Sequence, residues 1–263
     1  MTTDLLHNSP PSPTVLTERR GDVLLVTLNR PQVSNALNPD MLRGLSEAWI
    51  EAAGETCHAV VLTGAGRNFC AGADLATAAE NPGDMDLRRA FHPQLLALAA
   101  LKKPVIAAIN GAAAGGGLGL ALAADLRIMS DNARLVPAWV QIGLAPDLGA
   151  SWYATRLLGE ARAFDWFTMG ESMSAERALS LGLANEVTPP DALVARALNR
   201  AQALAAQPGL AVPLTKQLLA QARRNGLADQ LEAEIRIQTM AHATPGRTEQ
   251  VAARMASFAR KSS

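Results

Sequence analysis

The chain has 263 residues, with 24 basic and 24 acidic side chains and a formal net charge of zero. A chain of this length buries a full hydrophobic core, either as one large domain or as two small ones. Because its positive charges are neither in excess nor gathered in one block, the composition argues against nucleic-acid partners and membrane surfaces. The only cysteines, Cys57 and Cys70, provide no disulfide framework, which is typical of a reducing compartment.

The first residues are polar and rich in proline, and we expect a disordered tail over residues 1–14. They contain no apolar run of signal-peptide length, so the sequence predicts a soluble, cytoplasmic protein. The most apolar stretch, residues 104–124, is interrupted by Asn110-Gly111 and by three consecutive glycines. We therefore expect a buried strand and a helix in that stretch, and no membrane span.

Short β-branched runs alternate with helical patterns as far as about residue 190. The runs predict strands at Val23–Leu28, Ala59–Thr63, Val105–Ile109 and Leu126–Met129. The other patterns predict helices at Met41–Ala53, Leu87–Leu101 and Ser151–Leu158, and a short one between Ser174 and Gly182. This alternation is typical of stacked β/α units, so we expect an α/β fold.

Beyond Pro189-Pro190 the composition becomes helical, and we predict a core over residues 15–190 and a C-terminal helical region over residues 191–263. Within residues 226–243 the apolar residues Leu227, Leu231 and Ile235 recur every four positions. Such an amphipathic stripe must be buried against a partner surface. The sequence leaves open whether that surface belongs to the same chain or to another subunit.

Two glycine-rich loops each follow a short apolar strand. The first loop runs from Gly64 to Leu75, and the second contains Gly115-Gly116-Gly117 before an Ala/Leu helix. Glycine lets a ligand approach the main chain, and the free amides at a helix N-terminus favour negative charge. Two such loops, each giving one backbone N–H group, predict an oxyanion hole.

At these residues the chain resembles the crotonase superfamily of enoyl-CoA hydratases and isomerases. The blocks Val23–Pro31 and Ser34–Leu37 also match, and the resemblance continues to the C-terminal helices. It implies a ββα spiral core and a C-terminal helical trimerisation region, and hence a homotrimer or a hexamer built as a dimer of trimers.

The resemblance also implies that the N–H groups of Ala73 and Gly116 hold the thioester oxygen of an acyl-CoA substrate. Coenzyme A would enter as part of that substrate, with no other cofactor and no metal ion. The residues then expected around the substrate are Arg30, Ala36, Ala71, Asp74, Leu75, His92, Gly119 and Trp139.

The reaction depends on which acid or base lies beside the thioester. Hydratases of the superfamily carry two glutamates where this chain has Gly119 and Trp139, so simple hydration is not favoured. Asp147 matches the acid/base aspartate of the branch that includes epoxyphenylacetyl-CoA isomerases. We therefore predict an isomerase in which Asp147 moves a proton between two carbons. A helix N-cap is the alternative role for Asp147, because aspartate is favoured there.

Two other functions stay open. Aryl-CoA dehalogenases of the superfamily use an aspartate that attacks the ring, a tryptophan eight positions earlier that donates to it, and a histidine that activates water. Asp147, Trp139 and His92 fit that set. The aromatic cage that such enzymes form around the ring is thin here, because Ala73 stands where a bulky aromatic is expected and Phe91 is the one clear aromatic candidate nearby. The third possibility is a chain that binds acyl-CoA without turning it over.

Overall fold

The computed structural model describes residues 12–81, 83, 86–246, 248–249, 251–253 and 255–256. The predicted tail over residues 1–14 therefore lies almost wholly outside the described residues. The division at residue 190 stays a prediction.

A six-stranded sheet forms the centre of the molecule, in the order β1-β2-β3-β4-β6-β9. Only β1 and β2 are antiparallel, and every other neighbouring pair is parallel. The strands are β1 (Val15–Arg20), β2 (Val23–Leu28), β3 (Ala59–Gly64), β4 (Val105–Ile109), β6 (Leu126–Ser130) and β9 (Glu186–Thr188). The four strands predicted from β-branched runs are all present, and the α/β prediction is confirmed. β1 was not predicted because its side chains are mostly polar and exposed.

A second, three-stranded sheet stands beside the first, in the order β5-β7-β8. Its strands are β5 (Ala112–Ala114), β7 (Arg134–Val136) and β8 (Met173–Ser174). The chain passes from β4 of the large sheet to β5 of the small one within three residues. This crossing places the second glycine loop at the junction of the two sheets.

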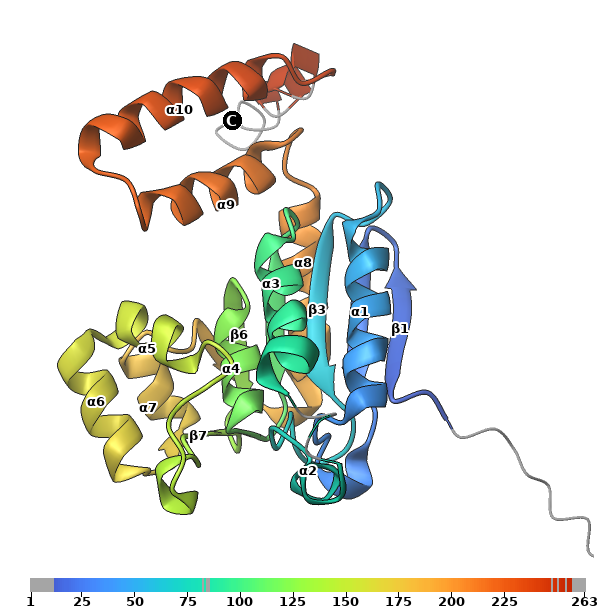
Figure 1. Ribbon diagram of the computed structural model, residues 1–263. Coiled ribbons are helices and arrows are strands. Elements are labelled where there is room, and N and C mark those ends of the chain that lie inside the picture. The colour runs from blue at the N-terminus through green and yellow to red at the C-terminus, as the bar shows by residue number, and fades with distance from the viewer. Residues whose placement is uncertain are drawn as a thin grey trace, which may run out of the picture.

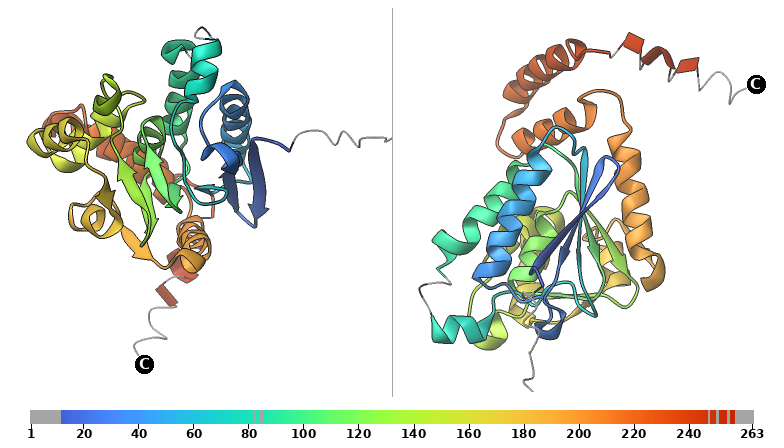
Figure 2. Two further views of the ribbon diagram at one scale, coloured as in Figure 1. Left: turned by 90° about the horizontal axis from the view of Figure 1, so that it is seen from below. Right: turned by 90° about the vertical axis from the view of Figure 1, so that its right-hand side faces the viewer.

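Helices cover both faces of the large sheet. One face packs against α1 (Pro39–Ala53), α3 (His92–Ala100) and α4 (Gly116–Ala123), and the other against α8 (Leu193–Ala205). Figure 2 shows the sheet between α1 and α8. Alternate residues of each strand enter two separate cores, as in Leu24 and Val26 on one side and Val23 and Leu25 on the other. Strands buried on both faces are continuously apolar, which explains why they were recognisable in the sequence.

The remaining helices form two groups. α2 (Leu75–Glu80), α5 (Ala150–Leu158), α6 (Glu160–Met169) and α7 (Ala175–Ser180) surround the small sheet and the glycine loops. α9 (Ala211–Ala222) and α10 (Leu227–His242) form a hairpin at one end of the molecule (Figure 1). Short 3₁₀ turns occur at Pro31–Val33, Val140–Ile142 and Pro190–Ala192. Among the residues described, no helix combines the length and apolar character needed to cross a bilayer.

One predicted helix differs from the structure in its geometry. Residues Leu87–Phe91 form a π-helical turn, and the α-helix itself starts only at His92. Pro93 stands in the first turn of α3, where its missing N–H group is tolerated, but it cannot bond back to the preceding turn. The predicted helix over Leu87–Leu101 is therefore divided just before this proline.

Candidate active site

A buried asparagine fixes the entrance to the first glycine loop. Asn35 is fully buried and its φ of 56° lies in the left-handed region. Its side-chain amide donates to the carbonyls of Ala65 (2.9 Å) and Asn68 (2.8 Å), and its Oδ1 accepts from the Arg30 amide (2.8 Å). These bonds hold the end of β2 and the first loop in a fixed relation.

Gly72 brings the two glycine loops into contact. Its φ is +94°, and a Cβ added there would lie 2.8 Å from the Gly116 nitrogen, so only glycine fits. Next to it, the Leu37 N–H donates to the Gly72 carbonyl, and the Leu37 carbonyl accepts from the Asp74 amide. Because these two bonds flank Ala73, the N–H group of Ala73 points away from Leu37. The backbone of Ala73 and that of Gly116 are therefore adjacent.

The two amides predicted to form the oxyanion hole have no internal acceptor. Within the described part of the chain, neither the Ala73 N–H nor the Gly116 N–H donates a hydrogen bond to the protein. Gly116 is the first residue of α4, where amides have no partner inside the helix. Gly115 before it has a φ of 48° and donates to the Val136 carbonyl at 3.1 Å. The site thus presents two free donors from two separate loops.

The loop that carries Asp147 reaches Gly116 through the next residue, Leu148. The Leu148 side chain lies against Gly116, and a Cβ added at Gly119 would overlap the Leu148 carbonyl oxygen. Leu148 itself has a φ of 46°, a conformation that is costly for a leucine. The loop that carries Asp147 is therefore packed tightly onto the first turn of α4. Gly119, at which the resemblance to hydratases implies a carboxylate, packs against this loop.

The carboxylate of Asp147 accepts a hydrogen bond of 2.8 Å from the indole Nε1 of Trp139. Burial raises the pKa of Asp147 above its usual range, while the Trp139 bond and the nearby charge of His92 act in the opposite direction. α5 begins at Ala150 with Gly149 at its N-cap and no side-chain cap. The alternative role of Asp147 as a helix cap is therefore wrong.

Aromatic packing holds the indole ring of Trp139, which donates to Asp147, in one orientation. Trp139 is 4% exposed, and its ring meets that of Phe167 edge to face at 5.8 Å. Phe167 in turn stacks on Trp166 at 5.3 Å. Because aromatic pairs of this kind are favourable and restrict rotation, α6 holds the Trp139 indole toward Asp147. His92, the first residue of α3, is exposed, which leaves its imidazole accessible to solvent.

The other expected substrate residues fall into two groups. Arg30 donates to Asp74 (2.8 Å) and to the Ala36 carbonyl (2.7 Å), so its guanidinium ties the first loop to β2. Burial opposes ionisation of Asp74, but the bonds from Arg30 and Thr77 outweigh it and the pKa is lowered. Ala71 and Leu75 are exposed beside this ion pair, whereas Ala36 is buried. A direct contact between Arg30 and a coenzyme A phosphate stays a prediction.

Four residues that shape this site were not singled out as such in the sequence, namely Asn35, Gly72, Leu148 and Phe167. Gly72 carried a signal, because it stands within the first glycine loop. Asn35 stands within the Ser34–Leu37 block that resembles the superfamily. Leu148 and Phe167 carried no such signal, because their importance comes from contacts with distant parts of the chain.

Comparisons with known proteins identify the family of the chain. A family model described as enoyl-CoA hydratase/isomerase matches residues 18–261. The 1,2-epoxyphenylacetyl-CoA isomerase of Escherichia coli is 36% identical over 249 residues, covering 92% of this chain and 95% of that protein. The 2,3-dehydroadipyl-CoA hydratase of the same organism is 37% identical over 244 residues, covering 91% and 94%.

Solved structures give the same result. The crystal structure of an enoyl-CoA hydratase from Bacillus anthracis matches with a TM-score of 0.87 and 30% identity, covering 93% of this chain and 96% of that one. The predicted crotonase fold is thereby confirmed. Since similar proteins are named as isomerases and as hydratases, the names alone leave the reaction open. The chain belongs to the enoyl-CoA hydratase/isomerase family, whose members act on acyl-CoA thioesters.

Proposed function

We propose that this protein is an acyl-CoA isomerase that moves a carbon–carbon double bond by proton transfer through Asp147. The observation that carries the proposal is the position of Asp147, whose loop packs directly on Gly116 through Leu148. This packing supports a placement of the Asp147 carboxylate near the amides of Ala73 and Gly116. Hydration by two glutamates has no support in the side chains, because Gly119 and Trp139 stand at those positions.

The thioester oxygen accepts hydrogen bonds from the Ala73 and Gly116 amides. As a proton leaves the carbon next to the carbonyl, negative charge builds up on that oxygen, and the preorganised donors stabilise it. One such donor is worth about a hundredfold to a thousandfold in rate. The partial positive charge at the start of α4 acts in the same direction.

Asp147 takes that proton as a carboxylate and becomes a neutral acid. The electron pair left on carbon is delocalised through the enolate into the adjacent double bond. Asp147 then returns the same proton to the carbon two positions further along, and the double bond moves by one place. A raised pKa suits both steps, because a more basic carboxylate removes a carbon-bound proton more readily.

A dehalogenase-like reaction is the second candidate, favoured by the Trp139 hydrogen bond to Asp147 and by the position of His92. In that reaction Asp147 attacks an aromatic ring carbon and halide leaves. Water activated by His92 then hydrolyses the aryl ester. Both candidates use acyl-CoA as the substrate, with coenzyme A as part of it and no further cofactor or metal ion.

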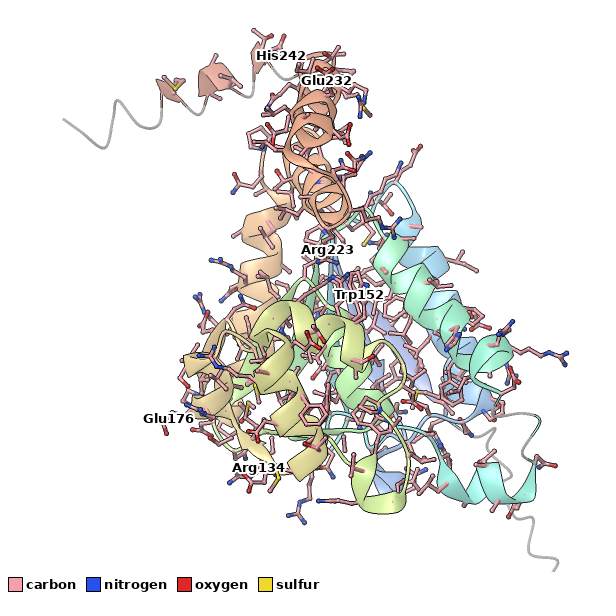
Figure 3. All side chains as sticks on the ribbon, turned by 60° about the vertical axis from the view of Figure 1, so that its left-hand side comes forward. Arg134, Trp152, Glu176, Arg223, Glu232 and His242 are labelled. Atoms are coloured by element: carbon pink, nitrogen blue, oxygen red, sulfur yellow. The ribbon has the colours of Figure 1, made fainter. Side chains whose placement is uncertain are left out.

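We also propose that the chain works as a homotrimer or as a dimer of trimers. The stripe predicted from the sequence is exposed on α10, where Leu227 is 78%, Leu231 50% and Ile235 60% exposed. Figure 3 shows Glu232 and His242 of the same helix far from the core. A second copy of the chain would cover this apolar surface, and the cytoplasm is the expected location.

The deciding variant is Asp147→Asn, which keeps the size and an oxygen that accepts the hydrogen bond from Trp139 but removes the carboxylate that takes up and returns the proton. We expect isomerisation of unsaturated acyl-CoA to fall by a hundredfold or more, as is typical for loss of a general acid/base. Exchange of the proton next to the carbonyl with deuterated solvent should be lost with it. Asp165→Asn, which removes an exposed carboxylate on α6, is the matched control.

The two candidate reactions give different products with the same variants. A covalent aryl ester on Asp147, detected by mass spectrometry with a halogenated aryl-CoA, would support dehalogenation. His92→Gln should stop halide release but leave double-bond migration within a few fold of the parent rate. A folded Asp147→Asn protein that isomerises at the parent rate would falsify the proton-transfer mechanism.

A further inference from the structure

A buried arginine lies at the far end of the helix that starts at the candidate oxyanion hole. Arg127, on β6, is 4% exposed. Its guanidinium donates hydrogen bonds to three backbone carbonyls, those of Ala124 (2.7 Å), Leu122 (3.5 Å) and Leu183. Leu122 lies in the last turn of α4, and Ala124 is its C-cap. Arg127 therefore caps the carboxyl end of α4, whose amino end carries Gly116.

This arginine keeps its charge inside the protein. Burial lowers the pKa of Arg127 to about 10, so the guanidinium is still protonated at neutral pH. Among the described residues, its hydrogen-bond acceptors are all backbone carbonyls. The carboxylate of Asp125, whose charge acts on Arg127, bonds instead to Lys216 at 2.6 Å and to the Val105 amide at 2.8 Å. The buried cation is therefore not neutralised by a directly bonded anion.

Hydrogen bonding alone does not require a charge at this position. Carbonyls also accept from a neutral amide, whereas a buried cation costs free energy because it loses its hydration. A positive charge at the carboxyl end of a helix offsets the negative end of the helix dipole. In α4 that negative end opposes the binding of an anion at Gly116. Cancelling it strengthens the anion site at the amino end.

The apolar character of α4 lets this charge act over the length of the helix. Its eight residues, GGLGLALA, include no polar side chain, and all but Ala123 are buried. At 1.5 Å per residue such a helix spans about 12 Å. For a unit charge at this distance and an effective dielectric constant of about 20, the Coulomb energy corresponds to about a tenfold change in an equilibrium constant.

We propose that Arg127 is a positioning residue for the oxyanion hole, which holds the carboxyl end of α4 and adds positive potential at the Gly116 amide. Because Arg127 is buried at the opposite end of α4, it acts through the helix and not by contact with substrate. This role rests on the proposed oxyanion hole, but it depends neither on Asp147 nor on which reaction follows. Loss of the charge should raise the free energy of a bound enolate and leave binding of the uncharged acyl group nearly unchanged.

The probe is 3-oxobutanoyl-CoA, whose enolate absorbs in the near ultraviolet and forms without turnover. A pH titration of its complex with the full-length protein measures the acid dissociation constant of the bound acyl group. In Arg127→Gln and in Arg127→Met we expect this constant to fall by about tenfold, since the enolate loses the field of one unit charge. The affinity for the probe at acid pH, where the acyl group is uncharged, should be nearly the parent value.

The two variants separate the charge from the hydrogen bonds. Arg127→Gln keeps N–H donors for the carbonyls and Arg127→Met keeps none, so the methionine variant should unfold at the lower temperature. Both lose the charge, and the same fall in the dissociation constant is expected for both. If the methionine variant does not fold, the glutamine variant carries the test. Arg196→Gln, which removes an exposed guanidinium from α8, is the matched control and should keep the parent constant.

Three outcomes would overturn the proposal, and they differ in what else they affect. Parent-like constants in both variants would remove the role of Arg127 and leave the oxyanion hole intact. A constant that falls with stability, much more in Arg127→Met than in Arg127→Gln, would show that Arg127 only holds the fold. If the parent protein does not favour the enolate of the bound probe over that of the free probe, the oxyanion hole itself is wrong, and the role of Arg127 with it.

Discussion

The ionisation of Asp147 follows from its immediate neighbours. Burial raises its pKa above the ordinary 3.8, while the Trp139 hydrogen bond, a bond from its own backbone amide and the charge of His92 work against this. The proposed base is the carboxylate, so kcat/KM should fall as the pH drops through this raised pKa. The acid limb of the pH profile is thus expected above the range of an ordinary aspartate.

The same pKa has a consequence for stability. A folded-state pKa above the unfolded one means that ionised Asp147 destabilises the fold. The protonated carboxyl group stabilises the fold. This contribution is complete below pH 3.8 and is lost as the pH rises through the raised folded-state pKa. At neutral pH the Asp147→Asn protein should therefore unfold at the parent temperature or above it, as measured by calorimetry. A strongly destabilised variant would show that the carboxylate has a structural partner.

Trp139→Phe removes the indole donor while keeping an aromatic ring against Phe167. Without that donor the pKa of Asp147 rises further, so the acid limb of kcat/KM should move to higher pH. Trp166→Phe is the matched control, since its Nε1 donates to the Glu171 carbonyl and not to Asp147. Equal pH profiles for the parent and the Trp139→Phe protein would contradict this role of the hydrogen bond.

At the level of elements, the packing of Leu148 on the first turn of α4 determines the position of the loop that carries Asp147. A Cβ at Gly119 overlaps the Leu148 carbonyl oxygen, so Gly119→Ala must push the Asp147 loop away. We expect a loss of about 1–3 kcal/mol in the free energy of unfolding, as is usual for overpacking. Turnover should fall as well. Gly226→Ala, at the open start of α10, is the control and should change neither quantity appreciably.

The ion pair of Arg30 and Asp74 joins the first glycine loop to the end of β2. Asp74→Asn keeps the cap on the Thr77 amide but removes the charge, and should cost about 1–3 kcal/mol at pH 7. The pKa of Asp74 is lowered, so this stabilisation is present above pH 3.8 and disappears as the pH falls through the folded-state value.

Urea unfolding at neutral and acid pH measures this difference. The difference in the free energy of unfolding between the parent and the Asp74→Asn protein should become smaller at acid pH. Asp86→Asn is the control, because Asp86 caps its turn through the Arg89 amide and belongs to no ion pair among the described residues. A gap that stays constant with pH would show that the charge of Asp74 contributes little.

At the scale of the whole molecule, the α9–α10 hairpin touches the core at few points. Lys216 pairs with Asp125 at 2.6 Å, and Arg223 lies over the ring of Trp152 at 4.9 Å. Figure 3 shows Trp152 and Arg223 near each other at this junction. These contacts leave the apolar stripe of α10 exposed. Contiguous exposed apolar residues of this kind are typical of a protein–protein interface.

Ile235→Glu places a charge within that stripe and should shift the protein toward monomers. Analytical ultracentrifugation at several concentrations measures the effect. Arg236→Gln changes the net charge by the same amount at a neighbouring exposed position off the stripe, and should leave the assembly intact. If both variants sediment like the parent, α10 is not the subunit interface.

Much of the molecule could be predicted from its amino-acid order. The buried strands were recognisable because their apolar runs have the length and β-branching of central strands. Asn38 and Pro39 mark the start of α1 before the predicted Met41, through a cap on the Met41 amide, and this local signal was overlooked. Such features depend on residues close together in the chain.

The sequence by itself determined the α/β class, the two glycine loops and the candidates Asp147, Trp139 and His92. Only the tertiary structure decided that Gly72 touches Gly116 and that Trp139 bonds to Asp147 and not to another acceptor. It also left the buried Trp49 Nε1 and Gln94 Oε1 without a partner among the described residues. The physical reason is that turns and strands follow from local conformational preferences, whereas these contacts join segments whose approach is set by packing of the whole core.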